Sequence, residues 1–313
     1  MATLDTRRIM LLVSLCMVPG LVIQTLLFGT GVLHNLLLAV TFGLGTEAGC
    51  LKLLQRPIRA GLSDGSVLVT ALLIAAALPP ACPWFVLLLA VAAGICLGKY
   101  AYGGLGNNVF NPAMVGYAVV LVSFPAALAA WPALAGVPSV SEASVDALTG
   151  ATALTALRFK GAATIEELHL AGGLFGTLGP SGWEWINLGY LLGGLILLSL
   201  RITAWRTSTG MLLALGGLAA LTWDSGSSAS HGSPLFHWLA GGTLLAAFFV
   251  VTDPVTHPTS RQGQWLFGLL VGSIVFLIRA FGNYPDGIAF AVLLANAMTP
   301  YLDRRLAGLS ARV

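Results

Sequence analysis

The sequence has very little charge for its length. Only 9% of the 313 residues are Asp, Glu, Lys or Arg, whereas 57% are hydrophobic, and the mean hydropathy is +0.89. About a quarter of the residues in an ordinary soluble domain are charged. The shortage of charge therefore excludes a soluble protein and indicates a chain embedded in a lipid bilayer.

The apolar stretches also lack the alternation of apolar and polar residues that marks a membrane-spanning β-strand. Backbone polar groups in lipid must find hydrogen-bond partners within the protein, so a span is either a helix or a strand of a closed barrel. Many of the runs are long enough to cross a hydrocarbon layer of roughly 30 Å as helices. The sequence therefore predicts an all-α polytopic membrane protein.

Clusters of metal-ligating residues and of basic residues are missing as well. The five histidines stand alone, and the cysteines form no C-x-x-C pair. The cysteines are Cys16, Cys50, Cys82 and Cys96. Their scatter argues against a zinc or iron–sulfur site held by this chain alone. The net charge of +3 comes without a basic block, so nucleic-acid binding is not expected.

We expect about ten transmembrane helices. Their predicted ranges are 9–28, 33–54, 62–79, 83–98, 109–126, 184–200, 209–222, 235–252, 265–281 and 286–302. With the N-terminus inside, only Arg158, Lys160 and Arg279 of the 15 basic residues fall on the outer side. Cytoplasmic loops are enriched in Lys and Arg. The charge pattern therefore predicts a bacterial inner-membrane protein with both termini in the cytoplasm and a periplasmic interval at 127–183.

Similar stretches in the two halves indicate an internal repeat. Residues 101–121 and 280–297 both begin with a small residue and an aromatic one, followed by a Gly/Asn-rich bend and a helix. The first bend opens the fifth span from the cytoplasmic side, and the second opens the tenth span from the outer side. Five spans per half therefore give the second half the inverted orientation that many transporters have. The predicted units are a first five-helix repeat at 1–126, the periplasmic loop at 127–183 and a second repeat at 184–313.

The segment GGLGNNVFNP, residues 103–112, is a candidate binding site. Its glycines let the backbone bend and approach a ligand closely. Asn108 and Asn111 are three residues apart, so they share a face if the segment is helical. Their amides both donate and accept hydrogen bonds, which suits a flat heterocycle. A turn that lets helices pack closely explains the same pattern about equally well.

Three carboxylates near the membrane are further candidates. Glu47 and Asp64 lie in or near the second and third spans, where a carboxylate is costly and is a functional candidate by default. A cation role is open for Glu47, whereas Asp64 has the alternative of capping the third span. Asp253 lies in the oxygen-rich segment 248–263, for which a capped helix end with a polar loop is the better interpretation.

The stretch VDALTGAT, residues 145–152, lies in the predicted outer interval. A threonine hydroxyl is a weak nucleophile. It is esterified only if an enzyme activates the other partner and grips the loop. Gly150 and Ala151 leave Thr152 sterically open to such an enzyme, and Asp146 adds an acidic contact at a fixed spacing. The alternative is an outer loop with ordinary Ser/Thr turn chemistry.

Together these segments make the chain resemble a known family. It comprises the D subunits of the Rnf complex, an ion-translocating ferredoxin:NAD oxidoreductase, and the related B subunits of the sodium-translocating NADH:quinone reductase. The similarity covers nearly the whole chain. It includes the DGS at Asp64, the GGLGNNVFNPAM segment from Gly103, the D-x-x-T-G-A-T loop from Asp146 and the TDPVT segment from Thr252.

The family has the flavinylation signature Asp-x-x-[Ser/Thr]-Gly-Ala-Thr. The resemblance implies that a flavin transferase joins FMN to Thr152 through a phosphoester. The other members of the motif are Asp146, Thr149, Gly150 and Ala151. The resemblance also implies a second flavin, riboflavin, held noncovalently among the spans, and we expect it near Asn108 and Asn111.

The implied function is electron transfer by a membrane protein that works within a larger complex and is not catalytic alone. Electrons would pass from a neighbouring flavoprotein to the outer flavin, then through the membrane to the second flavin and a cytoplasmic NAD-linked partner, coupled to movement of Na⁺ or H⁺. No side chain is expected to act as an acid or base, and no metal is expected. The implied partners are the A, B, C, E and G subunits of the complex. A cofactor-free inverted-repeat transporter or channel and a structural anchor are the alternatives, because a fold does not determine a function.

Overall fold

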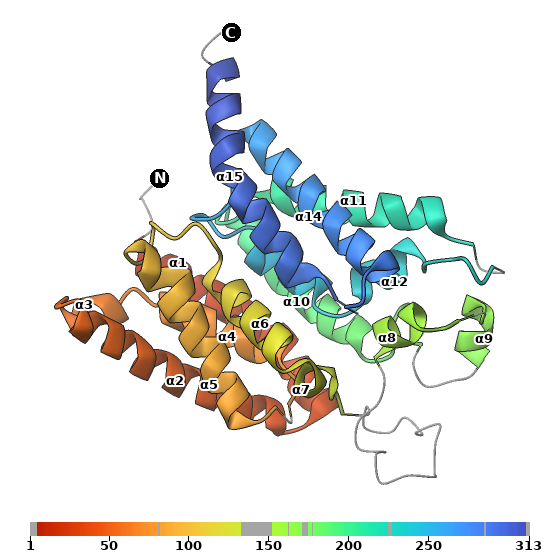
Figure 1. Ribbon diagram of the computed structural model, residues 1–313, viewed down its shortest axis with the longest axis horizontal. Helices are drawn as coiled ribbons and strands as arrows, with labels where there is room; N and C mark the ends of the chain where they lie inside the picture. Colours follow the sequence, from red (N-terminus) through yellow and green to blue (C-terminus); the bar gives the residue numbers. More distant parts are fainter. Residues whose placement is uncertain are drawn as a thin grey trace.

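The computed structural model describes residues 5–80, 82–132, 152–161, 163–170, 175–176, 178–224, 227–284 and 286–310. These residues form a bundle of helices without any β-strand longer than an isolated bridge (Figure 1). The elements in chain order are α1 (Thr6–Phe28), α2 (Gly31–Leu53), α3 (Ile58–Leu62), α4 (Ser66–Ala77), α5 (Trp84–Ala93), η1 (Gly94–Lys99), η2 (Tyr100–Tyr102), α6 (Pro112–Ser123), α7 (Pro125–Ala129), α8 (Ala153–Arg158), α9 (Ile165–Leu170), α10 (Trp183–Ser199), α11 (Trp205–Thr222), α12 (Pro234–Leu239), α13 (Thr243–Leu245), η3 (Ala246–Val250), α14 (Arg261–Phe281) and α15 (Ile288–Ser310).

Every predicted span overlaps a helix, and the prediction of an all-α polytopic membrane protein is confirmed. Four segments are long and apolar enough to cross a bilayer, namely α1, α2, the run Trp84–Tyr102 and α14. By contrast, α4 and α6 have 12 residues each. At about 1.5 Å per residue such helices reach only about 18 Å, less than the roughly 30 Å of the hydrocarbon layer. A count of ten complete crossings is therefore not confirmed.

The lateral surface of the bundle carries large apolar side chains. Leu26 of α1 is 75% exposed, Leu37 of α2 is 68% exposed, and Leu221 of α11 is 83% exposed. Large exposed apolar surfaces are rare on soluble monomers and mark contact with a partner or a membrane. This surface fits lipid, as the composition predicts.

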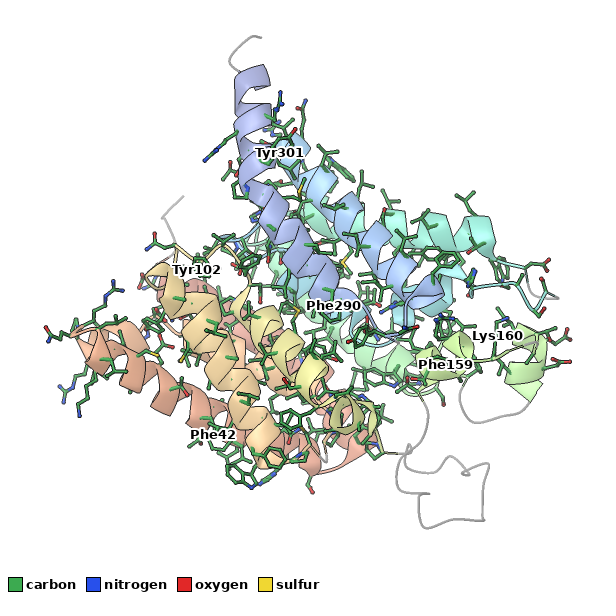
Figure 2. The ribbon with its side chains drawn as sticks, in the orientation of Figure 1. Phe42, Tyr102, Phe159, Lys160, Phe290 and Tyr301 are labelled. Carbon is green, nitrogen blue, oxygen red and sulfur yellow. The ribbon has the colours of Figure 1, made fainter. Side chains whose placement is uncertain are left out.

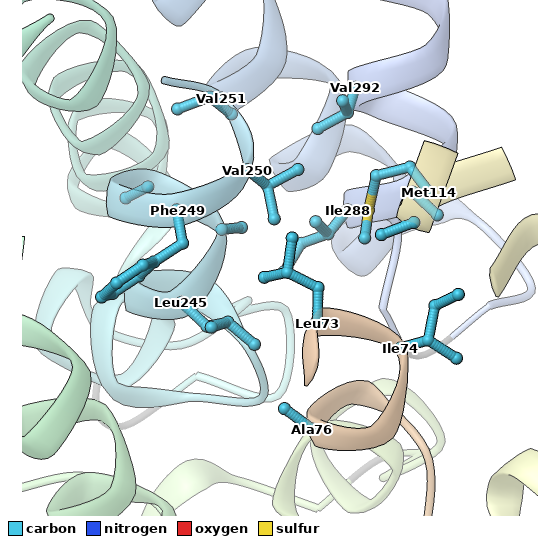
Figure 3. Packing of buried hydrophobic residues seen from close by; sticks show 14 of the residues in the cluster. Leu73, Ile74, Ala76, Met114, Leu245, Phe249, Val250, Val251, Ile288 and Val292 are labelled. Carbon is cyan, nitrogen blue, oxygen red and sulfur yellow. The ribbon is translucent and has the colours of Figure 1, made fainter. Parts of the chain in front are cut away.

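A continuous apolar core joins the first helices of the chain to the last ones. Figure 3 shows Leu73 and Ile74 of α4 beside Met114 of α6, facing Val250 of η3 and Ile288 of α15. These side chains come from segments that are far apart in the sequence. The middle of the molecule is therefore built by both halves of the chain.

The helices α1 and α10 approach each other closely because glycines face the contact. A Cβ atom on Gly193 would lie 1.7 Å from the backbone oxygen of Cys16. A Cβ atom on Gly189 would lie 2.9 Å from the Cα atom of Gly20. Small residues of this kind let membrane helices pack backbone against backbone. The α1–α10 contact thus joins the first half of the chain to the second.

The predicted span at 235–252 is broken in the structure, so its prediction as one helix was wrong. α12 ends at Leu239, and the chain turns through Gly241, whose φ is +54°, before α13 begins. Asn187 of α10 satisfies the interrupted backbone. Its Nδ2 donates to the oxygens of Leu239 (2.9 Å) and Gly241 (2.8 Å), and its Oδ1 accepts from the amide of Leu244 (2.9 Å). Buried irregular backbone is tolerated at membrane depth when such partners exist.

The division of the chain at 126 and 183 stays a prediction. α2 packs against α4 and α5 in the first half, and α11 packs against α12 and α14 in the second. The corresponding helices of the two predicted repeats therefore have corresponding neighbours. Of the interval 127–183, the structure describes α7, α8 and α9, and α8 and α9 lie on the side of the molecule opposite the end of α15 (Figure 1).

The glycine contact predicts the effect of adding one methyl group. Gly193→Ala should lower the free energy of unfolding by about 1–3 kcal/mol, because the backbone oxygen of Cys16 cannot move away as a flexible side chain would. Gly217→Ala is the matched control, since Gly217 of α11 has nothing within 4 Å of an added Cβ. Thermal unfolding of both variants in one detergent checks this. Equal melting temperatures for the two variants would contradict the close packing.

Candidate functional site

Thr152 stands at the start of α8, and its side chain is fixed there. It is the N-cap residue, and its Oγ1 accepts from the amide of Thr155 at 3.3 Å and lies 2.9 Å from the Oγ1 of Thr155. α8 is itself tied to the end of α14, because Arg158 Nε donates to the oxygen of Gly282 at 2.6 Å. Phe159 and Lys160, which follow α8, mark this end of the molecule in Figure 2. The hydroxyl of Thr152 is therefore held in place against the bundle.

The other members of the predicted flavinylation motif lie outside the described residues. They are Asp146, Thr149, Gly150 and Ala151. The prediction for these four residues stays a prediction. Thr152 is the residue of the motif whose surroundings the structure describes.

Thr152 lines a cavity of 330 Å³. The walls come from both halves of the chain, with Leu73 of α4 and Met114 of α6 on one side and Leu245 and Ile288 on the other. Ligand pockets in proteins have volumes of roughly 300–1,000 Å³ and are mostly apolar with a few polar groups. The cavity falls in this range and has this character.

Aromatic rings surround the part of the cavity near α10. Trp131 and Trp183 both line it, and their ring centroids are 4.7 Å apart at an interplanar angle of 70°. Tyr117 and Tyr284 also line the cavity. Aromatic side chains offer large flat surfaces on which a planar ring system can pack. The cavity therefore suits a flat aromatic molecule.

An ion pair between a buried arginine and a half-buried aspartate lies at the polar end of the cavity. Asp286 lines the cavity, and its Oδ1 lies 3.2 Å from Nη2 of Arg279. Arg279 also donates from Nη1 to the oxygen of His237 at 3.0 Å and from Nη2 to the hydroxyl of Thr243 at 2.9 Å. Hydrophobic surroundings make such a charge costly unless it is paired and hydrogen-bonded. Arg279 meets this condition, although sequence reasoning placed it only as an outer basic residue.

Asn108 and Asn111, which were expected to share a site, have different hydrogen-bond partners. Asn111 caps α6 through an Oδ1 that accepts from the amide of Met114 at 3.2 Å, and its Nδ2 donates to Asp253 at 3.2 Å. Asn108 donates to the oxygen of Phe110 at 3.2 Å, while its buried Oδ1 lacks a hydrogen-bond partner. Asn111 thus has a structural task. The riboflavin prediction at this place stays a prediction and depends on Asn108.

The segment around Asp253 is a turn that follows a helix end, which agrees with the favoured interpretation of a helix end with a polar loop. Asp253 Oδ1 accepts from the amide of Val255 at 3.1 Å, which closes a turn after η3. Asn296 of α15 donates to the oxygen of Thr256 at 3.1 Å and accepts from the amide of Asn111 at 3.0 Å. Burial raises the pKa of Asp253, and its hydrogen bonds oppose that shift. The loop therefore joins the start of α6 to α15.

Glu47 and Lys99 form another ion pair, in which both side chains are buried. Sequence reasoning left open whether Glu47 binds a cation. Glu47 Oε1 lies 2.5 Å from Nζ of Lys99 and accepts from the hydroxyl of Tyr100 at 2.8 Å. Lys99 also donates to the hydroxyl of Ser66 at 2.6 Å. The partner that holds Glu47 is therefore a lysine of this chain. Sequence reasoning missed this role of Lys99, although a single lysine at the end of the apolar run GICLGK was the available signal.

Asp64 lies just before the N-cap of α4, which is Gly65, so it is not itself the cap residue that the alternative interpretation predicted. Its Oδ1 accepts from the amide of Ser66 at 2.8 Å and from the hydroxyl of Ser66 at 2.7 Å. Its other carboxylate oxygen lies 3.9 Å from Nζ of Lys99. Asp64 thus binds the first residue of α4 and adds negative charge beside the buried Lys99.

Fold and site together define a class of protein. The described residues form a polytopic helical membrane protein with an aromatic-lined cavity, a buried Glu47–Lys99 ion pair and a half-buried Arg279–Asp286 pair. More specifically, the chain belongs to the NQR2, RnfD, RnfE family, whose match covers residues 1–308.

Curated relatives resemble the chain over almost its full length. It is 48% identical over 309 residues to the D subunit of the ion-translocating oxidoreductase complex of Pseudomonas paraeruginosa strain PA7, covering 96% of this chain and 90% of that one. The protein of the same name from Ectopseudomonas mendocina strain ymp is 49% identical over 306 residues, covering 95% and 89%. The one from Yersinia pseudotuberculosis strain IP 31758 is 41% identical over 327 residues, covering 96% and 92%. The expected family is confirmed.

The Glu47–Lys99 pair predicts non-additive effects of substitution. Lys99→Met should lower the free energy of unfolding by about 3–5 kcal/mol, because Glu47 is 0% exposed and would keep a buried charge without its cation. Glu47→Leu combined with Lys99→Met should recover most of this loss, since no unpaired charge remains. Thermal unfolding of the single and double variants checks this.

Lys52→Met supplies the control for that series. Lys52 lies on α2 like Glu47, but it is exposed, so its removal should change the unfolding temperature little. A Lys99→Met protein as stable as Lys52→Met would show that the buried pair does not hold α2 to η1.

Proposed function

We propose that this chain is the D-type membrane component of an ion-translocating oxidoreductase complex of the Rnf kind. In this proposal it carries FMN covalently on Thr152 and riboflavin noncovalently. The main support is the position of Thr152, which ends the D-x-x-T-G-A-T motif and lies on a cavity that is large enough and aromatic enough for a flavin ring. The names of the relatives support the complex.

The residues around Thr152 fit a flavin joined through a phosphoester. The ester oxygen would keep a lone pair, so Thr152 could still accept from the amide of Thr155 and cap α8. The apolar walls and the rings of Trp131 and Trp183 suit a planar heterocycle, and Asp286 and Asn283 supply polar contacts at one end. A flavin transferase would make the bond, because a threonine hydroxyl alone is a weak nucleophile.

When bound, the flavin supplies the redox chemistry, which ordinary side chains do not provide. The chain's own residues then have three tasks. Thr152 holds the ring at the cavity by a covalent bond, the aromatic walls exclude water, and the Arg279–Asp286 pair places charge beside it. No side chain needs to transfer a proton as a catalytic acid or base.

The second flavin is proposed near Asn108. Its Oδ1 is buried without a hydrogen-bond partner, and a buried acceptor of this kind costs free energy until a donor reaches it. A ring N–H of riboflavin is such a donor. Asn111 would act indirectly there, because its amide already links α6 to Asp253.

The proposed setting is the bacterial inner membrane, with both termini in the cytoplasm and the loop that bears Thr152 in the periplasm. Electrons would pass between ferredoxin-linked and NAD-linked partners, coupled to movement of Na⁺ or H⁺. The proposed partners are the A, B, C, E and G subunits of the complex. The charge distribution of the sequence supports this orientation.

The proposal predicts a covalent flavin that depends on one of two adjacent hydroxyls. After co-expression with a flavin transferase, a denaturing gel should show a fluorescent band for the wild type and for Thr155→Ala, and none for Thr152→Ala. Thr155 is the matched control because its Oγ1 is only 2.9 Å from that of Thr152. The backbone amide that Thr152 caps is retained in Thr155→Ala.

Two outcomes of this experiment decide against the proposal. A wild-type band without fluorescence would favour a cofactor-free transporter or channel. A fluorescent Thr152→Ala band would move the attachment point elsewhere. Separately, electron transfer that persists in an assembled complex containing Thr152→Ala would reduce the chain to a structural anchor.

A further inference from the structure

The polar end of the Thr152 cavity holds a carboxylate whose effect on the redox properties of a bound group the proposed function leaves open. Asp286 is the one carboxylate among the residues that line the cavity in the described part of the chain. Its side chain is 25% exposed, whereas that of Arg279 is 2% exposed. The carboxylate therefore faces the cavity, and the guanidinium stands behind it.

The hydrogen bonds of Asp286 fix one oxygen and leave the other at the cavity. Oδ1 pairs with Arg279 at 3.2 Å and accepts from the amide of Ile288 at 3.3 Å. Oδ2 lies beside Gly241, and a Cβ atom built on Gly241 would be 2.7 Å from it. Because Gly241 also lines the cavity, Oδ2 is the atom that a ligand would meet.

The start of α8 reaches the same place. The Cβ atom built on Gly241, 2.7 Å from Asp286 Oδ2, would also lie 3.1 Å from Cδ1 of Leu154. Leu154 is two residues after Thr152. A single methyl group at Gly241 would thus touch both side chains. Thr152 and Asp286 line the same cavity, so a planar group that is tethered to Thr152 and fills the cavity shares it with the carboxylate. Charges interact strongly in such an apolar site.

Arg279 cannot turn away from Asp286. Its guanidinium is held by the oxygen of His237 and the hydroxyl of Thr243 as well as by the carboxylate. The other titratable groups on the cavity wall are the tyrosines Tyr117, Tyr190 and Tyr284. The carboxylate is therefore held in a fixed position at the cavity.

We infer that Asp286, positioned by Arg279, sets the reduction potential of the group bound to Thr152. This inference rests on the proposed flavin. Two-electron reduction at neutral pH takes up one proton and leaves one negative charge on the flavin ring, and the carboxylate at Oδ2 disfavours that charge. Asp286 acts on the flavin through the electric field of its carboxylate and forms no covalent bond to it.

Removing the carboxylate tests this inference directly. In the purified, flavinylated protein, Asp286→Asn should shift the ratio of reduced to oxidised covalent flavin at least about tenfold toward the reduced form at a fixed ambient potential. The variant loses one negative charge, which leaves the positive charge of Arg279 uncompensated and favours the reduced flavin. For a two-electron couple, tenfold corresponds to about 30 mV. The absorbance of the bound flavin during a redox titration gives this ratio.

Two controls separate charge from structure. Asp286→Glu keeps the charge and should restore a potential close to the wild-type value. Glu166→Gln on α9 makes the same change in net charge at an exposed position outside the cavity, and it should leave the potential unchanged. A potential for Asp286→Asn equal to that of the wild type, in protein with the fluorescent band, would overturn this inference and leave the proposed function intact.

A second pair of variants decides the matter if Asp286→Asn does not fold. Gly242 lines the cavity, and an added Cβ would meet only Ile288 Cδ1, at 4.0 Å. Gly242→Asp should shift the flavin at least about tenfold toward the oxidised form relative to the uncharged Gly242→Asn. Equal potentials for these two proteins would overturn the inference. A wild type without covalent flavin would instead refute the proposed function.

Discussion

The absence of water inside the bilayer is the constraint on which the rest of this structure depends. A polar group at that depth must find its partner within the protein. Asn187 supplies three hydrogen bonds to the backbone where the chain breaks between α12 and α13. Glu47 and Arg279 each pair with an opposite charge. Broken helices and buried charges are therefore possible here only in combination with particular side chains from other helices.

The two buried cations occupy corresponding places in the proposed repeats. Lys99 ends the fourth predicted span of the first half, which α5 and η1 form. It donates to Ser66 at the start of α4, which is the third span. Arg279 lies in the last turn of α14, which is the fourth span of the second half. It donates to Thr243 at the start of α13, which belongs to the third span of that half. This correspondence supports an inverted repeat more strongly than the weak sequence similarity does. The acidic partners of the two cations do not correspond, since Glu47 lies in α2, the second span, whereas Asp286 precedes α15, the last span.

Hydropathy predicted the fold class because the bilayer acts on every residue of a span in the same way. Properties that depend on a distant residue could not be predicted. The break at Gly241 needs Asn187, and the link from Asn111 to the loop after η3 needs Asp253. Lys99 was counted only as a cytoplasmic charge, since nothing local shows that Glu47 lies opposite it. Thr152 differs, because the proposed flavin transferase would read a contiguous motif, and such a motif is visible in the sequence.

The position of Thr152 ties the proposed redox chemistry to the packing of the two halves. Arg158 of α8 donates hydrogen bonds to backbone oxygens at the end of α14, so Thr152, at the start of α8, is attached to the second half of the chain. The cavity that Thr152 lines has walls from α4 and α6 of the first half as well as from α13 and α15 of the second. Any displacement of one half against the other must therefore change the surroundings of a flavin held there. A linkage between two states is reciprocal, so a change in the charge of that flavin must also bias the arrangement of the halves. In the proposed function, this shared cavity is where electron transfer and a movement that passes ions would meet.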